Sequence, residues 1–202
     1  GQSLAAEALT VAENASTSPE VALGVALAPA KLPRHQVNWT VDEAIANRDH
    51  LLEITPAYVG ETWLPGTTTA NSAERHPEMY GMGHNEVGLA KNQNQPAVSV
   101  PIRGFRIGNT LISAHAGELF NELGTAIKDG FSGDRPWVAS YCDDYMGYIW
   151  TRQPHEEIKD IPVTEIVDMK AYRRYYGTTT SPYAPEAGET LVETAIAVLK
   201  TL

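Results

Sequence analysis

Hydrophobic and polar residues alternate through the middle of the chain in the pattern of β-strands. Residues 97–102 and 104–107 alternate in this way, and residues 110–114 continue the pattern. The pair Gly108-Asn109 between them is a two-residue turn signal. The pattern therefore predicts a β-hairpin, in which residues 110–114 form the returning strand.

Three further segments carry strand signals. Residues 21–27 are a short apolar run bounded by polar residues and by Pro29, which is typical of a buried strand. Residues 137–141 and 161–166 are shorter apolar segments between turn-forming or polar stretches. We expect each of the three to form a strand.

Three other segments carry the start, stop or spacing signals of helices. These segments are residues 41–53, 118–129 and 185–202. The first begins with a capping box, in which the Thr40 hydroxyl accepts from the amide of Glu43 and the Glu43 carboxylate returns the bond. The other two have apolar residues at three- and four-residue spacing, and Gly130 ends the earlier one. A helical piece is also expected around residues 78–92.

The order of these elements predicts an α/β-type fold of mixed α+β content, with a mixed sheet flanked by helices. Residues 1–20 lack a sustained period and are expected to form a mobile or partner-bound arm. Residues 21–202 would then form one domain. Residues 60–95 are dense in Gly, Pro, Asn and Thr, which is typical of a functional surface or of a segment covered by a partner.

Composition excludes several classes of function. The 202-residue chain has 15 basic and 25 acidic side chains and a net charge of −10, which opposes binding to a phosphate backbone. It contains no apolar stretch of about 18 residues that would span a bilayer. Its single cysteine excludes an internal disulfide and a thiolate metal cluster. We expect a secreted or periplasmic protein, and the start at Gly1 without a leader favours a processed product or fragment.

Two residues are candidate oxygen ligands for one metal ion. Glu118 follows a strand and a small-residue turn, and Tyr148 follows the strand at 137–141. The pattern places Glu118 at a helix N-terminus, where the helix dipole keeps a carboxylate ionised. Zinc accepts carboxylate oxygen but normally has three or four protein ligands, and the chain has no HExxH motif. A helix-capping glutamate and a core tyrosine are the alternative interpretations.

The second half of the chain resembles the catalytic domain of the neutral, non-lysosomal ceramidase family. Four motifs carry the resemblance in the family's order: Ile107-Gly108-Asn109, Ala116-Gly117-Glu118 where the family has Pro-Gly-Glu, the turn from Asp144 to Ile149, and Tyr175-Tyr176-Gly177-Thr178-Thr179-Thr180. The resemblance continues into the closing helix at 185–199. It identifies residues 21–202 with the C-terminal part of that catalytic domain.

The resemblance implies a zinc-dependent hydrolase that cleaves the amide bond between a fatty acid and a sphingoid base. Members hold zinc with two upstream histidines, with the glutamate matching Glu118 and with the tyrosine matching Tyr148. The tyrosine matching Tyr175 is a hydrogen-bonding residue beside the substrate, which fits a donor to the developing oxyanion. The implied cofactor is therefore Zn²⁺, with Glu118 and Tyr148 as metal ligands and Tyr175 as a catalytic residue.

The histidine ligands and active-site serine of the family lie in an N-terminal half that this chain does not contain. We therefore expect either a C-terminal subunit that completes its site with a second chain, or a relative that has lost the chemistry. Hydrolysis of a non-lipid amide or ester is an alternative activity on the same scaffold. A non-catalytic binding or assembly subunit is the alternative to an enzyme.

Two further sets of residues near the candidate ligands are weaker candidates. His115 could orient the Glu118 carboxylate or could be a strand-end histidine with satisfied nitrogens. Asp143 and Asp144 could bind a cation or lie solvated in a loop. Cys142 beside these two acids is a poor nucleophile, because negative neighbours disfavour its thiolate.

Overall fold

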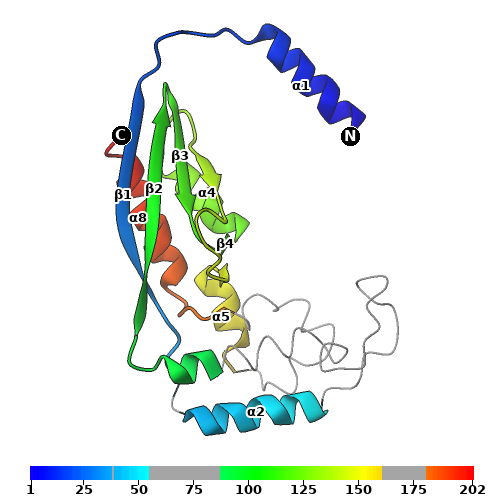
Figure 1. Cartoon of the computed structure of the whole chain (residues 1–202), viewed down its shortest axis with the longest axis vertical. Helices are drawn as coiled ribbons and strands as arrows, with labels where there is room; N and C mark the ends of the chain where they lie inside the picture. The colour runs from blue at the N-terminus through cyan, green and yellow to red at the C-terminus, as the bar shows by residue number, and fades with distance from the viewer. Residues whose placement is uncertain (38, 55–86, 161–180) are drawn as a thin grey trace.

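The computed structural model describes residues 1–37, 39–54, 87–160 and 181–202 (Figure 1). The helices that lie wholly within this part are α1 (Gln2–Asn14), α2 (Val41–Ile54), α4 (Asn121–Asp129), α5 (Arg152–Ile158) and α8 (Ala187–Leu199). The strands are β1 (Leu23–Pro33), β2 (Ala97–Ile107), β3 (Thr110–His115), β4 (Glu118–Leu119), β5 (Trp137–Ala139) and β6 (Tyr148–Ile149). Helices and strands both contribute to the fold.

The main sheet has four strands in the order β1-β2-β3-β5. Strands β1, β2 and β3 are antiparallel neighbours, whereas β5 runs parallel to β3. Ile107 pairs with Thr110, so Gly108 and Asn109 form the predicted two-residue turn. A second sheet consists of the parallel pair β4 and β6. The expected mixed sheet flanked by helices is therefore confirmed.

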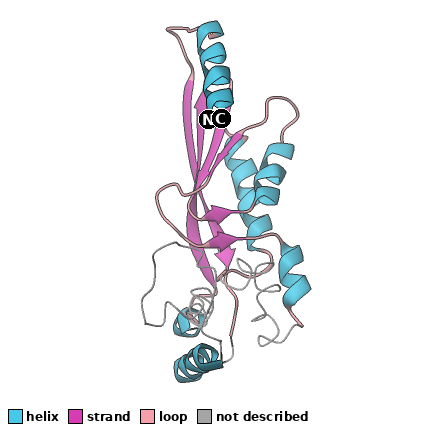
Figure 2. Ribbon diagram, turned by 90° about the vertical axis from the view of Figure 1, so that its right-hand side faces the viewer, coloured by secondary structure: helices cyan, strands magenta, loops and turns pink. Residues whose placement is uncertain are grey.

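Helix α8 covers one face of the main sheet, which we call the inner face. Figure 2 shows α4 and α8 together on one side of the strands. The approach is close at Gly104 of β2, where an added Cβ would lie 2.9 Å from a Val198 methyl carbon of α8. The core contains fully buried Ile102 of β2, Ile127 of α4 and Leu191 of α8. The predicted closing helix is confirmed, and its apolar positions belong to this core.

The opposite face of the sheet, which we call the outer face, presents apolar side chains to solvent. The backbone register places one row across all four strands, consisting of Val25, Phe105, Ile112 and Trp137. The exposed members of this face are Leu23 at 77%, Val25 at 72%, Leu27 at 62%, Ile107 at 51% and Trp137 at 68%. Exposed apolar side chains gathered on one face of a sheet are typical of an interaction surface.

The strand predicted as buried at 21–27 is the half-exposed edge strand β1. Its inner-face residues Ala30 and Leu32 are buried, whereas alternate residues lie on the outer face. The strand also continues past Pro29 to Pro33. Proline is tolerated because β1 pairs with β2 alone among the described strands, so the missing amide disrupts no second ladder.

Helix α2 begins with the predicted capping box. The Thr40 amide donates to the Glu43 carboxylate at 2.7 Å, and the Glu43 amide donates to the Thr40 hydroxyl at 3.2 Å. Ala44 of this helix packs with Val87 and Ala90 in a small separate cluster. The capping prediction is thus confirmed, and residues 87–91 at the end of the expected helix around 78–92 are helical.

Helix α1 has no buried residue, and the division into an arm at 1–20 and a domain at 21–202 stays a prediction. Helix α5 was not predicted from the sequence. The strand expected at 161–166 and the predicted catalytic residue Tyr175 lie outside the described residues. Among the described residues, no helix combines the length and the apolar character needed to cross a membrane.

Candidate functional site

The parallel pair β4 and β6 places Glu118 and Tyr148 directly beside each other. The two residues are partners in the backbone register, followed by Leu119 with Ile149. The Glu118 amide donates to the Gly147 carbonyl at 2.9 Å. Neighbouring strands lie about 4.8 Å apart, and residues in register present their side chains on the same face. The structure therefore brings together the two residues that the sequence singled out as metal ligands.

The side chains of this pair point away from the core. Ile149, the next residue of β6, is fully buried in the core, and side chains alternate between faces along a strand. The rings of Phe120 and Tyr148 lie 5.9 Å apart, and Phe120 stacks on Trp150 at 3.6 Å. Phe120 therefore contacts the rings of both Tyr148 and Trp150.

The turn before Glu118 depends on glycine. Gly117 has a left-handed φ of +88°, which residues with a side chain rarely adopt, and an added Cβ would lie 3.1 Å from the Gly147 carbonyl oxygen. The Gly117 amide in turn donates to the Asp144 carbonyl at 3.4 Å. Gly117 therefore permits the close approach of the chain segments that carry Glu118 and Tyr148.

The predicted position of Glu118 at a helix N-terminus is wrong. Glu118 lies in β4, Phe120 is the residue that precedes the helix, and α4 begins at Asn121. The reason is that the amides of Glu118 and Phe120 donate to the Gly147 and Ile149 carbonyls, which extends the chain before the helix starts. The helix dipole therefore does not act on this carboxylate directly, because its effect is limited to the first turn.

Two exposed tyrosines lie near the Glu118 carboxylate. The Glu118 carboxylate, as a nearby hydrogen-bond acceptor, is the main cause that raises the pKa of Tyr141 to about 12. Partial burial and the charge of Glu118 raise the pKa of Tyr145 as well. The two rings stack at 5.9 Å with an interplanar angle of 7°. Both shifts favour the neutral phenol, which is the form of tyrosine at neutral pH even at its ordinary pKa of about 10.

Sequence reasoning missed Tyr141. The available signal was its place at the end of the predicted strand 137–141, because the ends of neighbouring parallel strands meet at one edge of a sheet. Strand β5 is parallel to β3, and β3 leads directly to Gly117 and Glu118. Tyr141 and Glu118 thus emerge at the same edge.

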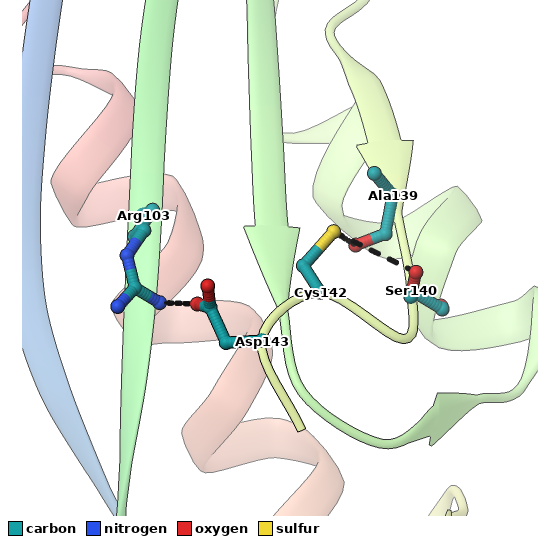
Figure 3. Close-up of polar contacts among 5 residues, drawn as sticks. All are labelled: Arg103, Ala139, Ser140, Cys142 and Asp143. Atoms are coloured by element: carbon teal, nitrogen blue, oxygen red, sulfur yellow. Dashed lines mark hydrogen bonds and ion pairs between the residues drawn. The ribbon is translucent and has the colours of Figure 1, made fainter. Parts of the chain in front are cut away.

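An ion pair attaches the loop at residues 140–147 to the main sheet. Arg103 of β2 pairs with Asp143, as Figure 3 shows. Arg103 belongs to the outer face, because it pairs with Leu27 and Ala114 in the register. Asp143 is thus an ion-pair partner, while Asp144 accepts from the Tyr145 amide at 2.7 Å. The Cys142 thiol lies 3.6 Å from the Ala139 and Ser140 carbonyl oxygens.

His115 agrees with neither interpretation proposed from the sequence. Its side chain is fully buried, and both ring nitrogens lack a hydrogen-bond partner in the part of the chain that the structure describes. It shares the inner face with its register partner Ile102. Burial lowers the pKa of His115, so the ring is neutral at pH 7. No hydrogen bond joins this ring to Glu118 within the same residues.

The donor set fits part of a zinc site. A carboxylate and a phenol side by side are oxygen donors, and zinc accepts carboxylate oxygen at about 2.0–2.2 Å. Within residues 1–37, 39–54, 87–160 and 181–202, no group of three or more His, Cys, Asp or Glu side chains could hold a metal. The described residues therefore offer an oxygen pair without the nitrogen donors of a zinc enzyme, and the predicted ligand roles stay predictions.

Comparison with known proteins gives matches at the level of structure. No protein-family profile matches the chain, and no curated protein matches it. A crystal structure of the neutral ceramidase from Pseudomonas aeruginosa is similar over 98% of this chain and 31% of its own, with 18% identity and a TM-score of 0.42. A ceramidase complexed with C2 is similar over 96% of this chain and 32% of its own, with 14% identity and a TM-score of 0.42. The chain thus spans about a third of the length of these structures.

Proposed function

We propose that this chain is the C-terminal part of the catalytic domain of a zinc-dependent, ceramidase-like hydrolase that cleaves an amide bond. The observation that carries the proposal is the register of β4 and β6, which sets Glu118 beside Tyr148. Two oxygen donors that lie far apart in the sequence and meet on one face are what a shared metal site requires. The motif resemblance supplies the amide as the bond to be cleaved.

Each proposed site residue has a defined task. Glu118 and Tyr148 would hold the zinc ion, which supplies a Lewis acid that polarises the amide carbonyl. The ring of Phe120, which stacks on Trp150, would shield one side of Tyr148 from water. Tyr175 is the proposed hydrogen-bond donor to the oxyanion that develops on the substrate.

The nitrogen donors would come from a second polypeptide, the N-terminal catalytic half. The outer face supports this proposal, because it presents a row of apolar residues across four strands and continues through Arg103 and Asp143 to the loop beside Glu118. A second copy of this chain is a poor occupant, since each copy carries a net charge of −10. The histidine-bearing half is therefore the proposed occupant of this face.

Charged substitutions on the outer face test the partner. In the double variant Val25→Glu and Leu27→Glu, both side chains point to solvent, so the chain is expected to fold while association with the N-terminal half is lost. Lys31→Glu is the control, because it lies on the same strand and face beyond the apolar row. Unchanged association in the double variant, measured by analytical ultracentrifugation, would contradict the proposed interface.

Metal content tests the ligand assignment. The complete protein is expected to carry one zinc ion per copy of this chain, measured by mass spectrometry of the metal, and Glu118→Gln is expected to lower this content well below one. Glu122→Gln is the matched control, because Glu122 is an exposed glutamate of α4 only four residues away. Equal zinc in the wild type and both variants would remove Glu118 from the site.

A non-catalytic binding or assembly subunit is the second candidate function. The outer face favours it, and so does the lack of a three-ligand metal group among the described residues. Metal-free protein that still binds its partner would establish this role. If zinc is present, hydrolysis of N-acyl lipids measured beside simple amides and esters identifies the substrate class and the proposed role in lipid metabolism. A secreted or periplasmic location remains part of the proposal.

A further inference from the structure

Helix α5 packs against the rest of the fold through a histidine. His155 is the buried residue of this helix, with 6% of its surface exposed. Its ring meets the ring of His35 edge to face, and the two ring centroids lie 5.3 Å apart. His35 follows β1 and is half-buried. Two rings that can each gain a proton therefore form the contact between α5 and the segment after β1.

The two sides of this contact are anchored differently. The His35 amide donates to the Pro182 carbonyl at 3.1 Å, so the backbone holds the segment after β1. Helix α5 pairs with α8 through Arg152 and Glu189 at 3.6 Å, but both side chains are exposed, and exposed ion pairs contribute little. A helix of 7 residues is also not stable alone in water. The histidine contact is thus the part of the α5 docking that a change of pH can remove.

The charged groups that face the pair lie on α5 and at the start of α8. Glu186 acts on both rings, whereas Arg152 and Glu156 act on His155. The two glutamates favour a protonated His155, and Arg152 and the neighbouring ring oppose it. Burial is the largest influence on both rings, and it lowers the pKa of His35 and that of His155, the latter to about 4. Both rings are therefore neutral at pH 7.

We propose that the contact between His35 and His155 is a pH-sensitive switch, which docks α5 while both rings are neutral and releases it when they gain protons. A protonated ring in the docked position would hold its charge away from water and beside a second ring that can be charged. A released ring is solvated and gains its proton more readily. Acid therefore favours the released helix, which is expected to unwind because it is short.

The release is expected to stay local. Strand β6, which ends before α5, keeps its own anchors, because the Ser181 hydroxyl donates to the Tyr148 carbonyl at 2.8 Å and the Glu118 amide donates to the Gly147 carbonyl at 2.9 Å. Neither bond involves a histidine. The amide of Glu118 therefore reports whether the fold opens as a whole. The switch does not depend on the proposed function, since neither histidine is a proposed metal ligand.

Amide hydrogen exchange in the full chain at pH 7 and pH 5 tests the switch. The opening equilibrium at the amides of His35 and Lys159 is expected to rise about twentyfold, as a pKa of 6.5 in the released ring and about 4 in the docked ring implies. The amide of Glu118 is expected to keep its protection. His155→Gln holds a neutral side chain at every pH and is expected to abolish the rise. Glu157→Gln, an exposed position of α5, is the matched control and is expected to retain it.

Titration of the histidine ring resonances in the wild type tests the switch without any substitution. The pKa of His155 is expected to lie well below 6.5. An ordinary pKa of His155, equal opening at the two pH values, or an unchanged rise in His155→Gln would each overturn the switch. A rise at Glu118 as large as that at His35 would also overturn it, because the whole fold would then be opening. The zinc content of the complete protein bears on the proposed function alone.

Discussion

Substitution of Gly117 by alanine tests whether the close approach of β4 and β6 depends on a missing side chain. Gly117 has a φ of +88°, and its added Cβ would lie 3.1 Å from the Gly147 carbonyl oxygen and 3.2 Å from the Ile149 Cδ1 atom. The substitution therefore introduces both backbone strain and a steric clash. Relief of the close contact requires the Gly147 backbone and the Ile149 side chain to give way by a few tenths of an ångström, which loosens the pairing of the strands that carry Glu118 and Tyr148.

The two effects have separable magnitudes. A residue with a side chain in a sparsely populated region costs about 1–3 kcal/mol, and overpacking of a close contact adds about 1–3 kcal/mol. Gly133→Ala isolates the first effect, because Gly133 has a φ of +130° and no atom within 4 Å of its added Cβ. We expect Gly117→Ala to lower the free energy of unfolding by about 1 kcal/mol or more beyond Gly133→Ala.

Denaturant unfolding of the chain measures the free energy for each variant, and the slope of the transition checks that both remain two-state. Tryptophan fluorescence is a suitable signal, because Trp150 stacks on Phe120 directly after the paired strands. The complete protein with Gly117→Ala is also expected to lose zinc affinity, whereas Gly133→Ala is expected to retain it. Equal losses of stability and unchanged zinc affinity would refute this explanation of the turn.

Further predictions concern the inner face and the buried histidines. Gly104→Val is expected to displace α8 and to lower the free energy of unfolding by about 1–3 kcal/mol, measured by the same denaturation. Gly88→Ala is the control, because its added Cβ meets no atom within 4 Å and alanine has the higher helix propensity, so no loss of stability is expected. Burial and the neighbouring His35 lower the pKa of His155 from 6.5 to about 4, so the unfolded chain binds more protons between these values. The contribution of His155 to the free energy of unfolding is therefore expected to be complete above pH 6.5 and to be lost as the pH falls toward 4. His155→Leu is expected to flatten this pH dependence in unfolding experiments at several pH values. A steeper dependence in His155→Leu would contradict the assignment.

Local signals predicted the elements whose sequence agrees with their environment. The capping box at Thr40 and Glu43 and the turn at Gly108 and Asn109 are complete within a few residues, so neither needs information about the tertiary structure. The closing helix α8 shows its buried stripe directly in its apolar spacing.

The errors arise where tertiary contacts decide. The apolar run at 21–27 was predicted as buried because the sequence does not show that one face of β1 is uncovered. Helix α5 has no apolar stripe, since His155 is its buried residue, and its i,i+4 pair of Gln153 and Glu157 lies on the surface. The helix at Glu118 begins later than predicted, because strand pairing with residues 147–149 takes the amides that the helix signal had assigned to a cap.

The candidate site was predicted only in part, because it too depends on tertiary contacts. Glu118 and Tyr148 were selected as residues near strand ends, and the register of two short parallel strands brings them together. Tyr141 was missed because its position near Glu118 depends on the parallel pairing of β3 and β5 and on a left-handed backbone, and neither is visible as a local pattern. The nitrogen donors could not be predicted from this chain, since the proposal places them in another polypeptide.

Anomalous diffraction at the zinc edge from crystals of the complete protein tests the central claim most directly. The account predicts one zinc peak between Glu118 and Tyr148, with a Glu118 carboxylate oxygen at about 2.0–2.2 Å and histidine nitrogens from the second polypeptide completing the site. A protein without a zinc peak, or a peak bound by side chains other than Glu118 and Tyr148, would contradict it.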